Sequence, residues 1–438
     1  MATRKRIRPE AELESAWQCL VGATLVSSDG ARLRLVYPGR LNRAWGPDIR
    51  DGVVWVGGAY VRGDIELHVE EAEWYRHGHC YDPEYNNVML HVVQRRTNGS
   101  GTVTQDGRNV LVMPLSSGLQ ARAPWLPCHK GTSDRDGEAL MKLLDRAGWE
   151  RFERKARSLR QDIERNGATQ AFWKVLCRTM GYSRNTGAFE ALSDRLPLET
   201  LTRLVAPEDL TVNQAWMLGV AGLLPSQRVG TAADERGARL ERIWLSLPDG
   251  IERIKEGAWD LAQVYPNNSP VRRIVGLSYL IMRYGGSNMA RRIMCLVGEP
   301  EELCTGFMVL GDQYWREHYD FGLRTRKSAV LGQGKAREIA VNSVLPFTFA
   351  WSGVGGGKGV GQRAADMYTC FPGGPDNAIT LHMKSQLGLG HGKPLTACRQ
   401  QGLIHLYRAY CCVGGCVGCP VASLYARPAR PGGLREKC

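Results

Sequence analysis

The short segment Asp64–Glu70 alternates strictly between polar and apolar side chains, and it constrains the fold more than any other part of the chain. Successive side chains of a β-strand point to opposite faces of its sheet, so this segment is predicted to form a strand. Val53–Val56 is a second predicted strand, and Gly57-Gly58 between the two is typical of a hairpin turn. One face of the expected sheet would carry Asp64, Glu66, His68 and Glu70.

Asp48 lies just before the first of these strands, where its carboxylate is expected to meet Glu66 and His68. Two adjacent carboxylates repel by up to about 4 kcal/mol at an effective dielectric of roughly 20, and a divalent cation removes that cost. Asp48 and Glu66 are therefore candidate ligands for Mg²⁺ or Mn²⁺, beside a histidine able to accept a proton near neutral pH. The alternative is an amphipathic strand whose charged face is simply solvated.

The pair Pro47-Asp48 followed by Glu66-Leu67-His68 resembles the core motif of PD-(D/E)XK nucleases, with histidine in place of the usual lysine. The expected elements follow the α-β-β-β-α-β order of those enzymes: a helix at 9–20, a strand at 33–37, the hairpin, a helix or loop at 71–85, and strands at 88–94 and 109–115.

This resemblance implies an α/β nuclease-like domain over residues 1–120 that hydrolyses phosphodiester bonds of DNA or RNA. Asp48 and Glu66 would hold the metal, and His68 would act as a base or a ligand. A neutral imidazole supplies no fixed positive charge, which leaves three alternatives. His68 works differently from the lysine, another cation assists it, or catalysis has been lost.

Longer motifs resemble a bacterial family known only as a domain of unknown function. They are GPD at 46–48, GDIELHV at 63–69, HGH at 77–79 and YNNVMLHVV at 85–93. The resemblance continues through GYSRN at 181–185, AGLLP at 221–225, PNNSPVRRI at 266–274 and the terminal cysteine cluster. It therefore implies that one family covers the length of the chain.

Three further histidines and an aspartate follow the acidic strand, at His77, His79, Asp82 and His91. Together with Asp64 they are candidate supporting residues, since such a group could bind Zn²⁺, position a phosphate or pair with the carboxylates. A zinc-dependent hydrolase of a small substrate, built on His77, His79 and His91, is an alternative function. The structural alternative is a turn in which the imidazole rings form hydrogen bonds with backbone groups.

Five cysteines gather near the C-terminus, at Cys398, Cys411, Cys412, Cys416 and Cys419. Four thiolates can hold structural Zn²⁺ or a [4Fe–4S] cluster, and some PD-(D/E)XK nucleases carry such a cluster outside the catalytic core. Cys398, Cys416 and Cys419, with one of Cys411 and Cys412, are therefore candidate ligands. Disulfides or unliganded thiols are the alternatives. The first residues carry charge but no apolar secretion segment, which instead predicts a reducing, cytoplasmic location.

Helical periodicity from residue 136 onward predicts an all-α domain at 121–345, followed by a helical segment at 346–438 that carries the cysteine cluster. The net charge of +13 favours a polyanionic partner, because each phosphate contact releases counterions. Acidic and basic side chains balance over residues 1–120, so the excess lies downstream, in clusters such as Arg272-Arg273 and Arg291-Arg292. Basic segments also aid solubility. A non-catalytic nucleic-acid-binding scaffold on a degenerate nuclease fold is the main alternative to a nuclease.

Overall fold

A computed structural model gives the structure of the 438-residue chain. It describes residues 9–97, 101–115, 126–130, 137–204, 209–246, 250–261, 265–285, 288–357, 359–390 and 394–425. The chain divides into two compact units, which we name the sheet unit (residues 1–148, 376–394 and 399–438) and the helical unit (residues 149–375 and 395–398). The C-terminal segment therefore groups with the N-terminal sheet.

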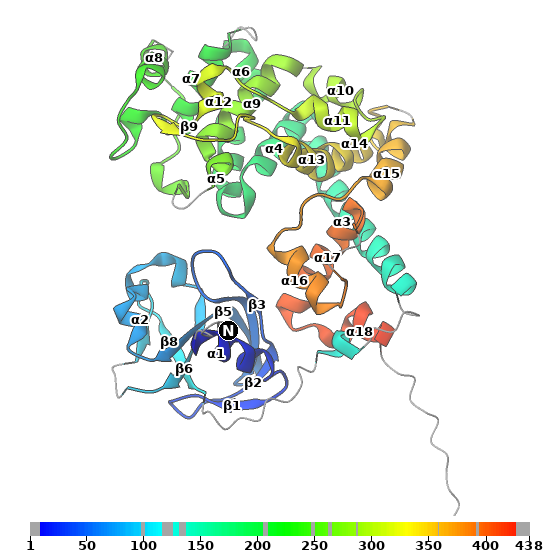
Figure 1. The fold of residues 1–438 in the computed structure, drawn as a ribbon. Coiled ribbons are helices and arrows are strands. Elements are labelled where there is room, and N and C mark those ends of the chain that lie inside the picture. Colours follow the sequence, from blue (N-terminus) through cyan, green and yellow to red (C-terminus); the bar gives the residue numbers. More distant parts are fainter. Residues whose placement is uncertain are drawn as a thin grey trace, which may run out of the picture. The chain divides into compact units, whose positions relative to one another are not determined.

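The sheet unit contains a mixed sheet whose strands follow the order β1-β2-β4-β5-β6-β8-β7, with β3 also paired to β4 (Figure 1). The strands are β1 (Thr24–Val26), β2 (Arg32–Tyr37), β3 (Arg40–Leu41), β4 (Ile49–Val56), β5 (Ala59–Glu70), β6 (Val88–Arg95), β7 (Thr102–Val103) and β8 (Asn109–Pro114). The strands β2, β4 and β5 are antiparallel neighbours, whereas β5, β6 and β8 run parallel. The predicted hairpin is confirmed, since Val56 pairs with Ala59 across the turn.

The two faces of β5 differ as the alternation predicted. Ile65 and Leu67 lie in an apolar core with Leu13 and Trp17 of helix α1 (Pro9–Gln18). The polar face of β5 is not solvated, because Glu66 and His68 are buried on it. Both faces of this strand are therefore covered.

The helical unit consists almost entirely of α-helices, and α3 (Gly137–Asn166) runs into it from the sheet unit. The larger helices that follow are α4 (Ala168–Met180), α5 (Tyr182–Arg195), α7 (Leu210–Val220), α8 (Glu235–Leu245), α9 (Pro270–Tyr284), α11 (Pro300–Phe307), α14 (Leu345–Ser352) and α15 (Val360–Cys370). One apolar core runs through them. The chain is thus a mixed sheet followed by a helical region, as the sequence predicted at this level.

The basic pairs singled out in the sequence differ in exposure. Arg272 is fully buried, and its guanidinium donates to the backbone carbonyls of Trp315 at 2.8 Å and Ala329 at 3.0 Å. Arg273 is buried beside it and donates to Asn268 at 3.0 Å. These two arginines therefore hold the helical unit together and are not available to phosphate groups. Arg291-Arg292, in contrast, is exposed.

The C-terminal part of the sheet unit comprises α16 (Ala378–Gln386), α17 (Ala397–Ala409), the 3₁₀ turns η10 (Cys411–Val413) and η11 (Cys416–Gly418), and α18 (Pro420–Tyr425). Two tyrosine hydroxyls join it to the sheet: Tyr407 donates to Asp51 at 2.5 Å, and Tyr37 lies 2.6 Å from His382. Within the described ranges, none of the helices has the length and apolar character needed to span a membrane.

Candidate functional site

Asp48 and Glu66 are brought together by the pairing of β4 with β5. The backbone N–H of Asp48 donates to Oε2 of Glu66 at 3.0 Å. In return, Oδ2 of Asp48 accepts a hydrogen bond from the backbone N–H of Leu67 at 3.1 Å. Each carboxylate is therefore fixed by the backbone of the other strand, and the two lie close enough for their charges to interact.

A local irregularity of β4 helps to place them. The register of β4 against β5 shifts between Ile49 and Gly52, and Asp51 within this bulge has a left-handed φ of 62°. Such a φ is costly for a residue with a side chain, and it occurs where the surroundings enforce it. Here the backbone N–H of Asp51 donates to Asp64 at 3.1 Å, which holds the bulge.

Two imidazoles approach the same carboxylate. Nε2 of His68 lies 3.5 Å and Nε2 of His79 lies 3.2 Å from Oε1 of Glu66. The exposed fractions are 4% for Glu66, 2% for His68 and 9% for His79, so the three side chains are largely withdrawn from solvent. Asp48 is only half-buried and His77 is exposed, which leaves an approach from solvent.

His77 joins this group through the turn at Gly78. The φ of Gly78 is 76°, a left-handed value that glycine adopts readily, and it lies between His77 at the end of α2 (Glu73–Arg76) and His79 in η1 (His79–Tyr81). One ligand nitrogen from each of His68, His77 and His79 lies within 4.8 Å of the other two. Among the described residues, this is the group whose spacing suits a metal ion.

His91 takes a different position, behind His68. Its Nε2 lies 2.9 Å from Nδ1 of His68, and its Nδ1 lies 2.9 Å from the hydroxyl of Thr102. Metal-ligating histidines commonly have the second ring nitrogen fixed in this way, which sets the tautomer and orientation of the ring. The chain Thr102–His91–His68 therefore directs Nε2 of His68 toward Glu66.

The charge states of these groups follow from burial. Burial, opposed by a hydrogen bond from the backbone of Asp48, raises the pKa of Glu66 to about 8. Burial and then the neighbouring Glu66 raise the pKa of Asp48 to about 7. Burial also lowers the pKa of His68 to about 2 and that of His91 to about 3. Near neutral pH the imidazoles of His68 and His91 are therefore neutral, and the carboxyl group of Glu66 holds its proton until a cation replaces it.

The other predicted supporting residues have structural contacts. Asp64 is buried and accepts from Arg50 at 2.8 Å, so its charge is already neutralised. Asp82 caps the 3₁₀ turn η2 (Pro83–Tyr85) by accepting from the backbone N–H of Glu84 at 2.9 Å. The sequence reasoning missed Tyr85, whose ring stacks on His79 with centroids 3.9 Å apart. Its place within the YNNVMLHVV motif was the available signal.

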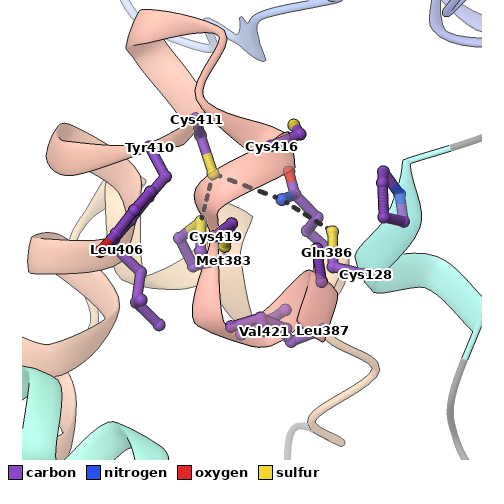
Figure 2. A pocket seen from close by; sticks show the side chains of 12 residues that line it. Cys128, Met383, Gln386, Leu387, Leu406, Tyr410, Cys411, Cys416, Cys419 and Val421 are labelled. Carbon is purple, nitrogen blue, oxygen red and sulfur yellow. Dashed lines mark hydrogen bonds between the residues drawn. The ribbon is translucent and has the colours of Figure 1, made fainter. Parts of the chain in front are cut away.

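The predicted cysteine ligands separate into three places. Cys411, Cys416 and Cys419 line one cavity of the sheet unit together with Cys128, which the sequence reasoning missed (Figure 2). Cys412, in the turn η10, instead contacts the backbone carbonyl of Arg408 near the end of α17, with its sulfur 3.4 Å away. Cys398 lies buried in the core of the helical unit, where it interacts with Tyr368.

Comparison with protein families gives one match. The model of a family described as "Protein of unknown function (DUF2851)" matches residues 10–373, which include all the histidines and carboxylates of this site. The chain therefore belongs to that family, as the sequence motifs indicated. No curated protein matches the chain significantly, and no solved structure does.

Proposed function

We propose that this member of the DUF2851 family is a metal-dependent nuclease that hydrolyses phosphodiester bonds of DNA or RNA. The observation that carries the proposal is the position of Glu66, which contacts Asp48 on one side and His68 and His79 on the other, next to the trio His68, His77 and His79. Buried groups with strongly shifted pKa values concentrate at functional sites, because burying ionisable side chains is otherwise costly.

The topology around these residues supports a PD-(D/E)XK-like core. Helix α1 is followed by the antiparallel strands β2, β4 and β5, then by the short helix α2, and then by β6 parallel to β5. Asp48 directly precedes the central strand of the meander, and Glu66 and His68 lie on the next strand. This is the order in which the nuclease motif distributes its acidic residues.

The donor set indicates the class of metal. His68, His77 and His79 offer three nitrogens spaced for one ion, and the adjoining Glu66 and Asp48 offer oxygen. Mg²⁺ favours oxygen ligands almost exclusively, whereas a set that includes imidazole suits Mn²⁺ or Zn²⁺ better. We therefore expect Mn²⁺ to support activity better than Mg²⁺.

Side chains of the protein would hold the cation and orient its ligands. A bound divalent cation would supply Lewis acidity, lowering the pKa of a coordinated water and offsetting phosphate charge. Asp48, half-buried and fixed through Oδ2 by the backbone N–H of Leu67, would hold the cation together with Glu66. His68 is held as a neutral ligand by His91, so its role is positional and differs from that of a lysine.

The histidine trio also favours a second candidate, a zinc-dependent hydrolase of a small substrate. Three imidazole ligands with an open position are a common catalytic zinc site. The substrate distinguishes the two candidates. A nuclease must accept a polymeric phosphodiester from the solvent side of the site, where Asp48 is half-buried and His77 is exposed.

The full-length protein should be incubated with single- and double-stranded DNA and RNA, with Mn²⁺, Zn²⁺, Mg²⁺ or a chelator. We expect cleavage of at least one nucleic acid with Mn²⁺, and none with the chelator. Cleavage of small chromogenic esters alone, with Zn²⁺, would select the second candidate. No cleavage of any substrate with any metal would refute both and favour a binding scaffold.

A further inference from the structure

Four cysteines from two distant parts of the sequence meet in one cavity of the sheet unit. Cys411, Cys416 and Cys419 come from the C-terminal segment, and Cys128 comes from the 3₁₀ turn η3 (Pro127–Lys130). The turn η3 packs against α18, which begins directly after Cys419. The cysteine side chains and their neighbours are drawn in Figure 2.

The backbone between the three C-terminal cysteines is folded into two short turns. Cys411 begins η10 and Cys416 begins η11, and Gly414 between them has a left-handed φ of 72°. A Cβ atom on Gly414 would meet Val36 at 3.1 Å and Val53 at 3.2 Å, so the loop lies directly on the sheet. Glycine is therefore needed here both for its conformation and for the close approach.

A buried amide connects the two parts. The side-chain N–H₂ of Gln386 lies 3.4 Å from the sulfur of Cys128 and 3.6 Å from the sulfur of Cys411, and Gln386 is itself only 8% exposed (Figure 2). Amide donors directed at sulfur stabilise thiolates around metal centres. Gln386 thus has the contacts of a supporting residue for two ligands.

We propose that Cys128, Cys411, Cys416 and Cys419 form a four-thiolate centre for a thiophilic metal, either a zinc ion or an iron–sulfur cluster. This inference is independent of the proposed nuclease activity. Cys128 takes the fourth position that the sequence assigned to Cys398, and Cys411 rather than its neighbour Cys412 faces the cavity. Four thiolates with no other ligand type suit both kinds of centre.

The spacing of the sulfurs bears on the kind of centre. Within the described residues, no three of these sulfurs lie within 4.8 Å of one another. A zinc ion with bonds near 2.3 Å would hold tetrahedral sulfurs about 3.8 Å apart, so zinc binding requires them to close in. An iron–sulfur cluster places several atoms between its cysteines and accepts a wider spacing.

The centre would join the turn at Cys128 to the C-terminal segment and hold both beside the sheet. It would thereby fix the loop at Gly414 against β2 and β4, the second of which begins directly after Asp48. Metal binding of this kind contributes folding free energy outright, so loss of the metal should loosen the C-terminal segment.

The test compares two single substitutions in the full-length protein purified without oxygen. Cys128→Ser should lose about one zinc equivalent per chain, or the brown colour and visible absorption of an iron–sulfur cluster. Cys412→Ser is the matched control and should retain the metal, because the sulfur of Cys412 contacts the backbone carbonyl of Arg408 and Cys412 does not line the cavity. Equal metal content in wild type and Cys128→Ser would overturn the assignment.

X-ray absorption on the wild-type protein keeps the proposal testable even if Cys128→Ser fails to fold. The spectrum at the zinc or iron edge should contain a component whose ligands are all sulfur. Iron and zinc edges distinguish the two kinds of centre directly. Metal bound only through nitrogen and oxygen, or a protein with neither metal and with these cysteines in disulfides, would contradict the proposal.

Discussion

Replacing Glu66 with glutamine is expected to abolish metal-dependent nuclease activity, with a loss of more than about 100-fold and an intact fold. Loss of a residue that only orients a metal ligand typically costs 10- to 100-fold, and removal of a charged ligand should cost more. Glutamine keeps the size of the side chain and can still accept the hydrogen bond from the backbone of Asp48. Initial rates of nucleic-acid cleavage with saturating and limiting Mn²⁺ measure the effect.

Glu70→Gln provides the matched control. Glu70 lies on the same strand, contacts Arg95 at 3.1 Å, and has a side chain that is 37% exposed. Cleavage by Glu70→Gln should match wild type within a few-fold. If Glu66→Gln retained wild-type cleavage, Glu66 would not hold the metal, and the site would have to be reassigned.

Metal affinity should rise steeply with pH between 6 and 8. A carboxyl group must lose its proton before it can bind a cation, so protons compete with the metal below the pKa values of about 8 for Glu66 and about 7 for Asp48. The imidazole of His68 does not add to this competition, because burial lowers its pKa to about 2 and it is already neutral. The affinity for Mn²⁺ should therefore increase by roughly 500-fold over this range, about 50-fold from Glu66 and about 10-fold from Asp48.

Calorimetric titrations with Mn²⁺ at several pH values measure this dependence, and buffers of different ionisation enthalpy report the protons released. Glu66→Gln removes one of the two titrating carboxyl groups, so the affinity of this variant for Mn²⁺ should depend less on pH than that of the wild-type protein. An affinity for Mn²⁺ that stays constant from pH 6 to pH 8 would mean that the two carboxyl groups do not ligate the ion.

The sequence predicted the strand that carries the site, because polar and apolar residues alternate along it and successive side chains of a strand point to opposite faces of the sheet. It placed Ile65 and Leu67 on the core side and Glu66 with His68 opposite, and the structure agrees. The turn at HGH, where Gly78 has a left-handed φ, had been considered only as the structural alternative to a binding site. Local patterns of this kind depend only on residues that are close in sequence.

The alternation of polar and apolar residues predicts which way a side chain points. It does not predict how deeply the side chain is buried or which groups it contacts. Asp64 appeared equivalent to Glu66, yet the bulge in β4 gives it the backbone of Asp51 and the side chain of Arg50 as partners. The position of His91 depends on the parallel register of β6 against β5, in which Glu66 pairs with His91. Register between strands separated by a helix has no signature in either strand alone.

The predicted cysteine ligands show the same limit over a longer distance in the sequence. Cys398 was chosen because it lies near the CxxC pair in sequence, but the helix between them carries it into the core of the helical unit. Cys128 was missed because a single cysteine far from the cluster carries no spacing signal. Only the packing of η3 against α18 brings it to the cavity.

The central claim, that Glu66 and the surrounding histidines form a metal site, is tested most directly by anomalous diffraction from crystals of the full-length protein grown with Mn²⁺. We predict an anomalous peak about 2.2 Å from the carboxylate of Glu66 and from imidazole nitrogens of His68 and His79. Glu66→Gln crystals grown in the same way should lack this peak. A structure with Mn²⁺ bound elsewhere and no density between Glu66 and His68 would contradict the account.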